Sequence, residues 1–154
     1  MAGPSHRATA NLLVALQFVA LGGVVLAAWV TGPAGWPWVG AAVVVAAMAL
    51  AVWGARALGP GLTALPIPNE RAVLRTDGPF AWSRHPIYAA LIVGAAGVVI
   101  WSGRWPTLVA WAVLVVVLRV KSGWEEARLR ERFPGYDAYA AVTPRFLGLR
   151  RPTG

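Results

Sequence analysis

The sequence predicts an all-α, polytopic integral membrane protein with about four transmembrane helices and a cytoplasmic C-terminal helix and tail. Of its 154 residues, 58% are hydrophobic and only 13% are charged, which is far from the balance of a soluble domain. Four apolar runs, separated by turns rich in glycine and proline, are long enough or nearly long enough to cross a bilayer. The length fits a single membrane-embedded domain over residues 1–154.

The charge and cysteine content exclude several classes of function. The chain has no cysteine, which excludes disulfides, thiolate metal sites and cysteine nucleophiles, and we identify no other metal site. A net charge of +8 would suit nucleic acid, but the basic residues cluster beside apolar runs, where anionic lipid headgroups explain them better. The sequence therefore indicates a membrane partner and no nucleic acid.

The first two apolar runs predict a helical hairpin within residues 1–58. Residues 12–30 are long enough to span a bilayer, and residues 36–58 form a second span after the turn signal of residues 31–35. Gln17 interrupts the first span. Because an amide in apolar surroundings needs a partner, we expect an interhelical hydrogen bond there in preference to a ligand contact.

Residues 59–86 predict a cytoplasmic loop or lid. Four prolines and several charged side chains within residues 59–84 disfavour a continuous helix in this segment. A loop of this length is more often functional than idle, because irregular backbone has to find hydrogen-bond partners. The prolines are Pro60, Pro66, Pro68 and Pro79.

Residues 87–101 and 105–120 predict a second helical hairpin, although each run is only marginally long for a full span. Proline fits the first turn of a helix, so Pro86 predicts a helix start with His85 just outside and Tyr88 within the first turn. The unpaired N–H groups of such a start suit an anionic or electron-rich ligand. The alternative to a ligand site is that Arg84 and His85 only cap the helix and anchor it at the lipid headgroups.

The same hairpin has two further features. Ala90, Gly94 and Gly97 place small residues at helical spacing, which favours close helix packing over room for a flat ligand. Residues 121–133 contain no proline, so we expect the last helix to continue into water, to end at residues 134–135 and to be followed by a polar tail.

Arginine and lysine predict the orientation in the membrane. They gather at the N-terminus, in residues 56–84 and in residues 119–151, all on one side of the predicted topology, and Arg104 stands alone on the other. Both termini are therefore expected in the cytoplasm.

This topology brings two polar segments together. Residues 84–88 begin one helix, and Glu125 and Glu126 lie near the end of the next, so a pocket half in lipid can form between them. Adjacent glutamates point about 100° apart on a helix, so we expect one of them to face the pocket. Ordinary ion pairing with nearby arginines and lysines is the alternative for both.

Four spaced motifs carry a resemblance to a known family. In this order and combination they resemble the isoprenylcysteine carboxyl methyltransferase family, and the resemblance extends to the related phospholipid methyltransferases. It covers roughly the C-terminal half, whereas the N-terminal half matches no motif. The motifs are Gly78-Pro79-Phe80, Arg84-His85-Pro86-Ile87-Tyr88, Glu125-Glu126, and Phe133-Pro134-Gly135-Tyr136-Asp137-Ala138-Tyr139 with Thr143-Pro144-Arg145-Phe146.

The resemblance implies a small helical membrane enzyme that binds S-adenosylmethionine at the cytoplasmic side, chiefly through residues 87–154. Such a cofactor needs a carboxylate for its ammonium, donors for its carboxylate and apolar walls for its adenine. The resemblance implies cofactor contacts from His85, Pro86, Tyr88, Glu125, Glu126 and Tyr139.

Two acceptor chemistries stay open, and they give different roles to the catalytic candidates Glu126 and Arg145. A carboxylate acceptor, as in an isoprenylcysteine-type substrate, is ionised near neutral pH and needs no general base, and Arg145 could orient it with two parallel hydrogen bonds. An amine acceptor, as in phosphatidylethanolamine, has to lose a proton, which makes Glu126 or His85 a candidate base.

In both cases we expect a lipophilic acceptor that enters laterally from the bilayer. A membrane scaffold without catalysis is a different class of answer. The sequence does not indicate the oligomeric state.

Overall fold

The computed structural model describes residues 4–67 and 70–148, and this part of the chain is helical with connecting loops. The long helices are α1 (Pro4–Thr31), α2 (Pro37–Leu58), α3 (Pro86–Ser102) and α4 (Trp105–Arg132). The short ones are the 3₁₀ helices η1 (Gly59–Gly61) and η2 (Gly78–Ala81) and the helix α5 (Tyr136–Val142). Among the predicted features, Pro68 and the basic residues beyond position 148 lie outside the described residues.

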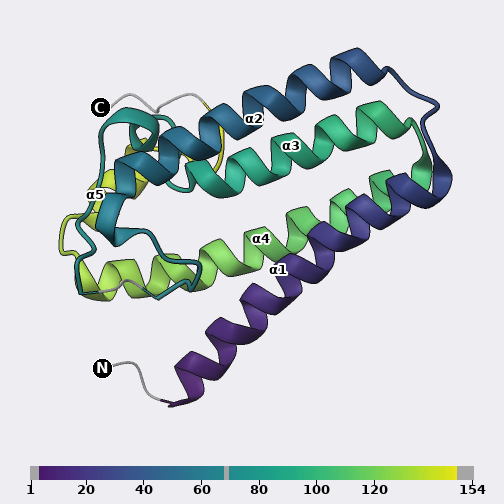
Figure 1. Cartoon of the computed structure of the whole chain (residues 1–154). Coiled ribbons are helices and arrows are strands. Elements are labelled where there is room, and N and C mark those ends of the chain that lie inside the picture. Colours follow the sequence, from purple (N-terminus) through teal and green to yellow (C-terminus); the bar gives the residue numbers. More distant parts are fainter. Residues whose placement is uncertain (1–3, 68–69, 149–154) are drawn as a thin grey trace.

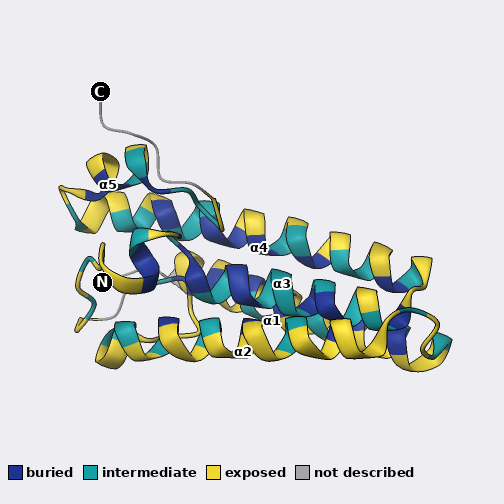
Figure 2. Ribbon diagram, turned by 90° about the horizontal axis from the view of Figure 1, so that it is seen from above, coloured by how far each residue is buried: buried dark blue, intermediate teal, exposed yellow. Residues whose placement is uncertain are grey.

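The predicted all-α membrane fold is confirmed. Three helices, α1, α2 and α4, are long and apolar enough to cross a membrane, and α3 is a shorter apolar helix of 17 residues. Large apolar side chains on the outer faces of the bundle are exposed, among them Val19, Trp29, Val45 and Val116 (Figure 2). Exposed apolar faces of this kind suit contact with lipid.

The four long helices form one bundle, with the longest loop and the short helices at one end and two short turns at the other (Figure 1). α1 packs along α4, α2 packs along α3, and α3 also contacts α4. The first two spans are antiparallel and joined by a short turn, as the predicted hairpin requires, but each packs mainly against a helix of the second pair. The loop between α2 and α3 and the helix α5 lie at the end where α1 begins.

The turn between α1 and α2 closes the opposite end of the bundle by capping α3. The backbone N–H groups of Ala34, Gly35 and Trp36 donate to the carbonyl oxygens of residues 102, 101 and 100, at 2.9, 3.2 and 3.0 Å. The last carbonyls of a helix have no partner within it, so these bonds satisfy groups that would otherwise be orphaned. A Cβ at Gly35 would collide with the carbonyl oxygen of Ile100, so this close approach requires glycine.

Small residues bring α2 and α3 into close contact, as predicted. A Cβ on Gly97 would lie 2.8 Å from the carbonyl oxygen of Gly40, and a Cβ on Gly94 would lie 3.3 Å from the Cβ of Ala47. The two backbones therefore touch along this face, and the predicted use of the small residues in packing is confirmed.

The C-terminal segment contains one element that was not expected from its sequence. α4 continues as one helix to Arg132, as predicted, but residues 136–142 then form α5. A helix of seven residues is too short to be stable alone, and this one is held by the buried rings of Tyr136 and Tyr139. Tyr139 also donates a hydrogen bond of 2.6 Å to the carbonyl oxygen of Phe80 in η2.

Candidate active site

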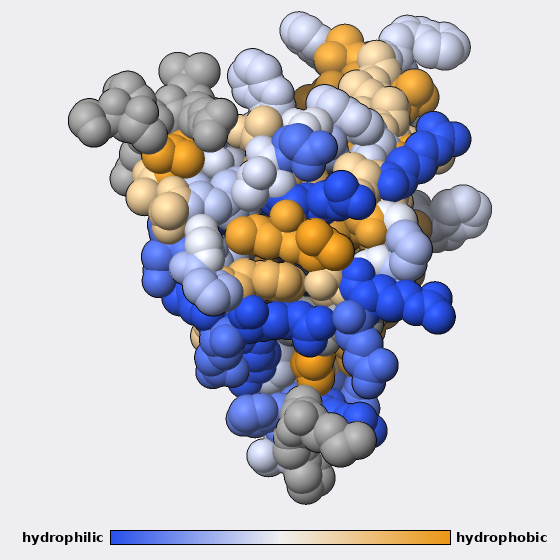
Figure 3. Space-filling model, turned by 90° about the vertical axis from the view of Figure 1, so that its left-hand side faces the viewer, coloured by the Kyte–Doolittle hydropathy of each residue, from blue (hydrophilic) through white to orange (hydrophobic). Residues whose placement is uncertain are grey.

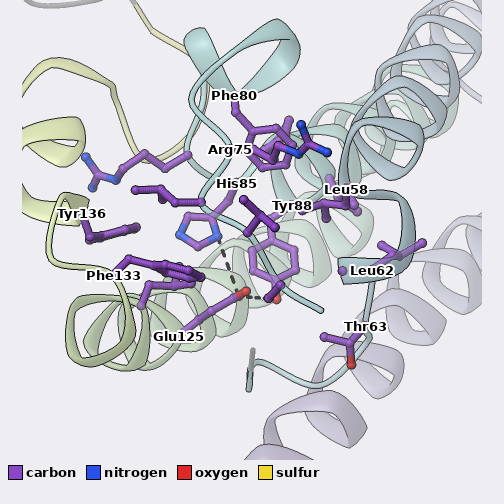
Figure 4. Close-up of a pocket in the computed structure, with 18 of the residues that line it drawn as sticks. Leu58, Leu62, Thr63, Arg75, Phe80, His85, Tyr88, Glu125, Phe133 and Tyr136 are labelled. Atoms are coloured by element: carbon purple, nitrogen blue, oxygen red, sulfur yellow. Dashed lines mark hydrogen bonds and ion pairs between the residues drawn. The ribbon is translucent and has the colours of Figure 1, made fainter. Parts of the chain in front are cut away.

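A cavity of about 430 Å³ opens at the end of the bundle that carries the loops. Its walls come from the loop after α2, from η2, from the first turn of α3, from the last turns of α4 and from α5 (Figure 4). Viewed from this end, hydrophilic side chains surround a central group of apolar ones (Figure 3). The volume lies within the range of small-molecule sites.

The start of α3 places two aromatic rings in the cavity wall. Pro86 occupies the beginning of the helix with His85 as the residue before it, which confirms the predicted helix start. The rings of His85 and Tyr88 stack with centroids 5.3 Å apart and planes 4° apart. Pro86 and both rings line the cavity, so the turn that proline starts also sets the orientation of the side chains that face the cavity.

Glu125 presents its carboxylate to the same cavity from α4. The Tyr88 hydroxyl donates to Glu125 Oε2 at 2.8 Å, and His85 Nδ1 lies 3.8 Å from the same oxygen (Figure 4). The Glu125 side chain keeps 23% of its surface exposed. Its carboxylate is thus oriented by two side chains and still reachable by a ligand.

Glu126 points the other way and is enclosed by cations. Its side chain is fully buried, and its Oε1 accepts hydrogen bonds from Arg84 Nε at 3.1 Å and from Arg145 Nε at 3.0 Å. Arg145 Nη2 lies 2.8 Å from the second oxygen, Oε2, and His85 Nε2 lies 3.2 Å from Oε1. Because these three side chains already occupy its oxygens, the Glu126 carboxylate stabilises the fold and is not free to bind a ligand.

The ionic cluster around Glu126 also docks the C-terminal segment. The backbone N–H groups of Arg84 and His85 donate to the carbonyl oxygens of Pro144 and Arg145, at 2.9 and 3.1 Å. Arg84 Nη1 further donates to the carbonyl oxygen of Thr143 at 2.5 Å. The tail is therefore bound to the start of α3 by both backbone and side-chain contacts.

The residues proposed from sequence divide into two groups. His85, Pro86, Tyr88, Glu125 and Tyr139 line the cavity. Glu126 and Arg145, which were expected to act on the acceptor, are not among the described residues that line it, and they contact each other instead.

Two further buried residues line the cavity that the sequence did not single out as site residues. Lys121 is 1% exposed, and its ammonium donates to Gln17 Oε1 at 2.6 Å and to the carbonyl oxygen of Ala64 at 3.1 Å. The interhelical hydrogen bond predicted for Gln17 is thereby confirmed. The only sequence signal for Lys121 was its spacing, four residues before Glu125 on a helix.

Tyr136 is the second of these residues. It is 1% exposed, and no hydrogen-bond partner for its hydroxyl is found among the described residues. Burial raises the pKa of Tyr136, so its phenol stays neutral and able to donate. A buried polar group without a partner at a cavity wall is available to a ligand.

The charged lining of the cavity is mostly cationic. Among the described lining residues, Arg75, Arg84 and Lys121 carry positive charge, whereas Glu125 is the carboxylate. Arg84 is already paired with Glu126, so Arg75 and Lys121 are the lining cations that can attract a negatively charged group of a ligand.

A second, wholly apolar groove of about 400 Å³ lies next to the cavity within the bundle. It runs between α1 and α2 with α3 as its floor, because these two helices pack on their partners instead of on each other. Gly22 lines the groove from α1, Met48 lines it from α2, and Gly94 lies in its floor on α3. Leu91 lines both the groove and the polar cavity. The two spaces therefore meet at Leu91.

A bundle of helices long and apolar enough to cross a membrane, with a polar cavity at one end and an adjoining apolar groove, is the architecture of an integral membrane protein. The model of the phospholipid methyltransferase family matches residues 35–135 of the chain. The chain belongs to this family, a group of membrane methyltransferases acting on lipid-type substrates, which confirms the resemblance seen in the motifs. Searches of curated proteins and of solved structures found no match.

The matched segment also shows which parts of the site lie outside the family model. It includes α2, α3 and α4, and it therefore reaches further towards the N-terminus than the motifs did. It ends just before Tyr136, so α1, α5 and the tail are not part of it. Gln17, Tyr136 and Tyr139 are thus contributions of the unmatched segments to the cavity.

Proposed function

We propose that this protein transfers a methyl group from S-adenosylmethionine to a lipophilic acceptor at the membrane surface. The observation that carries the proposal is the position of Glu125, a carboxylate oriented by Tyr88 and His85 at the wall of a cavity of suitable size. In its bound state the cofactor would supply an electrophilic methyl group on a sulfonium. What the chain supplies is a place to hold it.

The residues present fit this cofactor. Its ammonium needs a carboxylate, and Glu125 is the carboxylate among the described lining residues. The aromatic and apolar side chains of Phe80, Phe133 and Leu58 provide walls for an adenine ring. The Tyr136 hydroxyl, which has no hydrogen-bond partner among the described residues, can donate to the cofactor. We assign the ammonium to Glu125, because Glu126 is already surrounded by arginine and histidine.

A carboxylate acceptor of the isoprenylcysteine type is the acceptor chemistry that the geometry supports best. Such an acceptor is ionised near neutral pH, so alignment and exclusion of water are the main tasks of the site. The cationic side chain of Arg75 in the lining suits its negative charge. The expected base Glu126 is enclosed away from the cavity, which suits a reaction that needs no base.

Methylation of a phospholipid amine is the second candidate, and the family match is the observation that favours it. In that reaction a side chain has to accept a proton from the acceptor amine. His85 lines the cavity and is the candidate, although it already contacts both glutamates.

The apolar groove supports the lipophilic nature of the acceptor. It meets the polar cavity at Leu91 and lies among side chains of the membrane-spanning helices. An acceptor whose reactive group enters the cavity could place its hydrocarbon chain in the groove. This arrangement is in keeping with lateral entry from the bilayer.

We further propose that the cavity and both termini face the cytoplasm. The cavity end carries most of the arginines, whereas Arg104 lies at the opposite end, between α3 and α4. Cytoplasmic ends of membrane helices are enriched in arginine and lysine.

Two measurements test the proposed function. Calorimetry of the purified protein with S-adenosylhomocysteine should show binding, and incubation with labelled S-adenosylmethionine and lipid extracts should yield a labelled lipid whose chemistry identifies the acceptor. Absence of binding and of label would favour a membrane scaffold without catalysis. A labelled amine in place of a labelled ester would select the phospholipid reaction.

A further inference from the structure

Lys121 is a buried charge whose surroundings do not balance it. Its side chain leaves 1% of the residue exposed, and its two hydrogen bonds go to neutral oxygens, those of Gln17 and Ala64. Within the described residues, no ion pair joins Lys121 to a carboxylate. Burying a cation without a counter-ion costs free energy of folding, so we looked for a function that would account for Lys121.

The position of Lys121 offers that reason. It lines the polar cavity, and an ammonium has three N–H donors, of which Gln17 and Ala64 take two. One donor is left for an anionic group in the cavity.

Tyr88 keeps Lys121 apart from the nearest acidic side chain of the cavity. Lys121 and Glu125 are four residues apart on α4 and thus share one face of the helix. The Lys121 ammonium lies 5.0 Å above the Tyr88 ring, and the hydroxyl of the same ring donates to Glu125 at 2.8 Å. The tyrosine therefore stands between two opposite charges that would otherwise pair.

We propose that Lys121 binds the carboxylate of an α-amino acid group whose ammonium is bound by Glu125, so that the two residues together hold a zwitterion. This inference rests on the proposed function, because the zwitterion is the amino-acid end of the cofactor. Carboxylate and ammonium of such a group are separated by one carbon, which requires two opposite charges that are close but not paired with each other. Lys121, Tyr88 and Glu125 provide this arrangement.

The proposal also gives α1 a role in the site. Gln17 holds the Lys121 ammonium from a helix outside the family-matched segment, and Ala64 holds it from the loop after α2. Gln17 is then a positioning residue that acts through Lys121.

A comparison of two ligands tests the proposal. S-adenosylhomocysteine carries the carboxylate, and 5′-deoxy-5′-(3-aminopropylthio)adenosine is the same molecule without it. Calorimetry on the full-length parent should show a preference for the first ligand of about tenfold or more, as expected for a charge-assisted hydrogen bond. Lys121→Met should lose this preference, because only its affinity for S-adenosylhomocysteine should fall. Lys121→Arg should keep part of the preference.

Three control variants separate ligand binding from structure. Lys121→Gln is a second neutral variant that can still pair with Gln17, and it should lose the preference in the same way as Lys121→Met. Arg119→Met removes a charge from an exposed position two residues away and should leave the preference intact. Gln17→Met keeps the cation but removes the hydrogen bond that positions it, so the preference should shrink without being lost.

The outcomes are distinguishable. If Lys121→Met weakens both ligands equally, Lys121 is only structural and the proposal fails. If the preference is unchanged while the KM for N-acetyl-S-farnesylcysteine rises, Lys121 binds the acceptor and the assignment to the cofactor is overturned. If the parent binds neither ligand, the proposed function itself fails.

Discussion

Two neighbouring glutamates on α4 have opposite environments. Glu125 lies at the cavity wall with part of its surface open, whereas Glu126 is fully buried among Arg84, Arg145 and His85. The helix turns by about 100° between them, so Glu125 meets the cavity on one side and Glu126 meets the docked tail on the other. Substituting each of them by glutamine therefore distinguishes an effect on ligand binding, at Glu125, from an effect on the stability of the fold, at Glu126.

We predict that Glu125→Gln weakens binding of S-adenosylhomocysteine by about tenfold or more, because a charge-assisted contact with the ammonium is lost. Glu126→Gln should instead destabilise the fold by about 3 kcal/mol, because three cationic or polar partners lose their carboxylate. Calorimetry and thermal unfolding in the same detergent measure the two effects. The assignment is contradicted if Glu126→Gln abolishes binding in a protein of unchanged stability.

Sequence reasoning brought the start of α3 and the end of α4 together at one cavity, as the structure has them, but it could not choose between the two glutamates. The start of α3 at Pro86 follows from local backbone chemistry, so its position was predictable. The face of α4 that meets the cavity depends on how the whole bundle packs. Lys121 was missed for a similar reason, since its burial depends on Gln17, which is 104 residues away in the sequence.

At the scale of elements, helix boundaries were predictable and helix partners were not. The spans were expected at residues 12–30 and 36–58. The structure has α2 at Pro37–Leu58, whereas α1, at Pro4–Thr31, begins eight residues before the expected span. Apart from Gln17, the membrane-spanning parts of both helices are apolar all round, so their sequences do not show which helix each face contacts. The packing of α1 against α4 could therefore not be predicted from the sequence.

The docking of the tail gives a prediction at the same scale. Arg145 holds Glu126 through two guanidinium nitrogens, so Arg145→Lys keeps the charge but loses one of two parallel bonds. We expect a lower thermal unfolding temperature and faster proteolysis of the tail, with Arg145→Ala more severe. Arg119→Lys, at an exposed position, is the matched control and should be silent.

A different result would restore the role first expected for Arg145. If Arg145→Lys leaves stability unchanged but lowers turnover far more than cofactor affinity, the side chain acts on the acceptor. If it leaves stability and turnover both unchanged, Arg145 has neither role.

The whole molecule is polarised along its length. The loops, α5 and the cavity gather at one end, and the short turns close the other (Figure 1). Because the chain has no cysteine, a single introduced cysteine reports the side of the membrane without background. Arg104 and Asp137 are exposed residues at opposite ends.

We predict that Arg104→Cys reacts with a membrane-impermeant maleimide on intact cells, whereas Asp137→Cys reacts only after permeabilisation. This follows from the excess of arginine at the cavity end. The reverse pattern would place the cavity outside the cytoplasm, and S-adenosylmethionine would then be an implausible ligand for it.

The last prediction concerns the route of the acceptor. The apolar groove between α1 and α2 meets the cavity at Leu91, and Gly22 lines it with open space around its missing side chain. Gly23 also has open space around it but does not line the groove. Gly22→Phe and Gly23→Phe are therefore the same substitution on the same helix, and only the first fills the groove.

If the hydrocarbon chain of the acceptor lies in this groove, Gly22→Phe should raise the KM for a long-chain acceptor several-fold, because the ring occupies the space of the chain. Turnover of a short-chain, water-soluble analogue and affinity for S-adenosylhomocysteine should not change, since the polar cavity is untouched. Gly23→Phe should match the parent in all three measurements. Equal effects of the two variants, or equal KM values of the parent for the short and the long acceptor, would show that the chain does not use the groove.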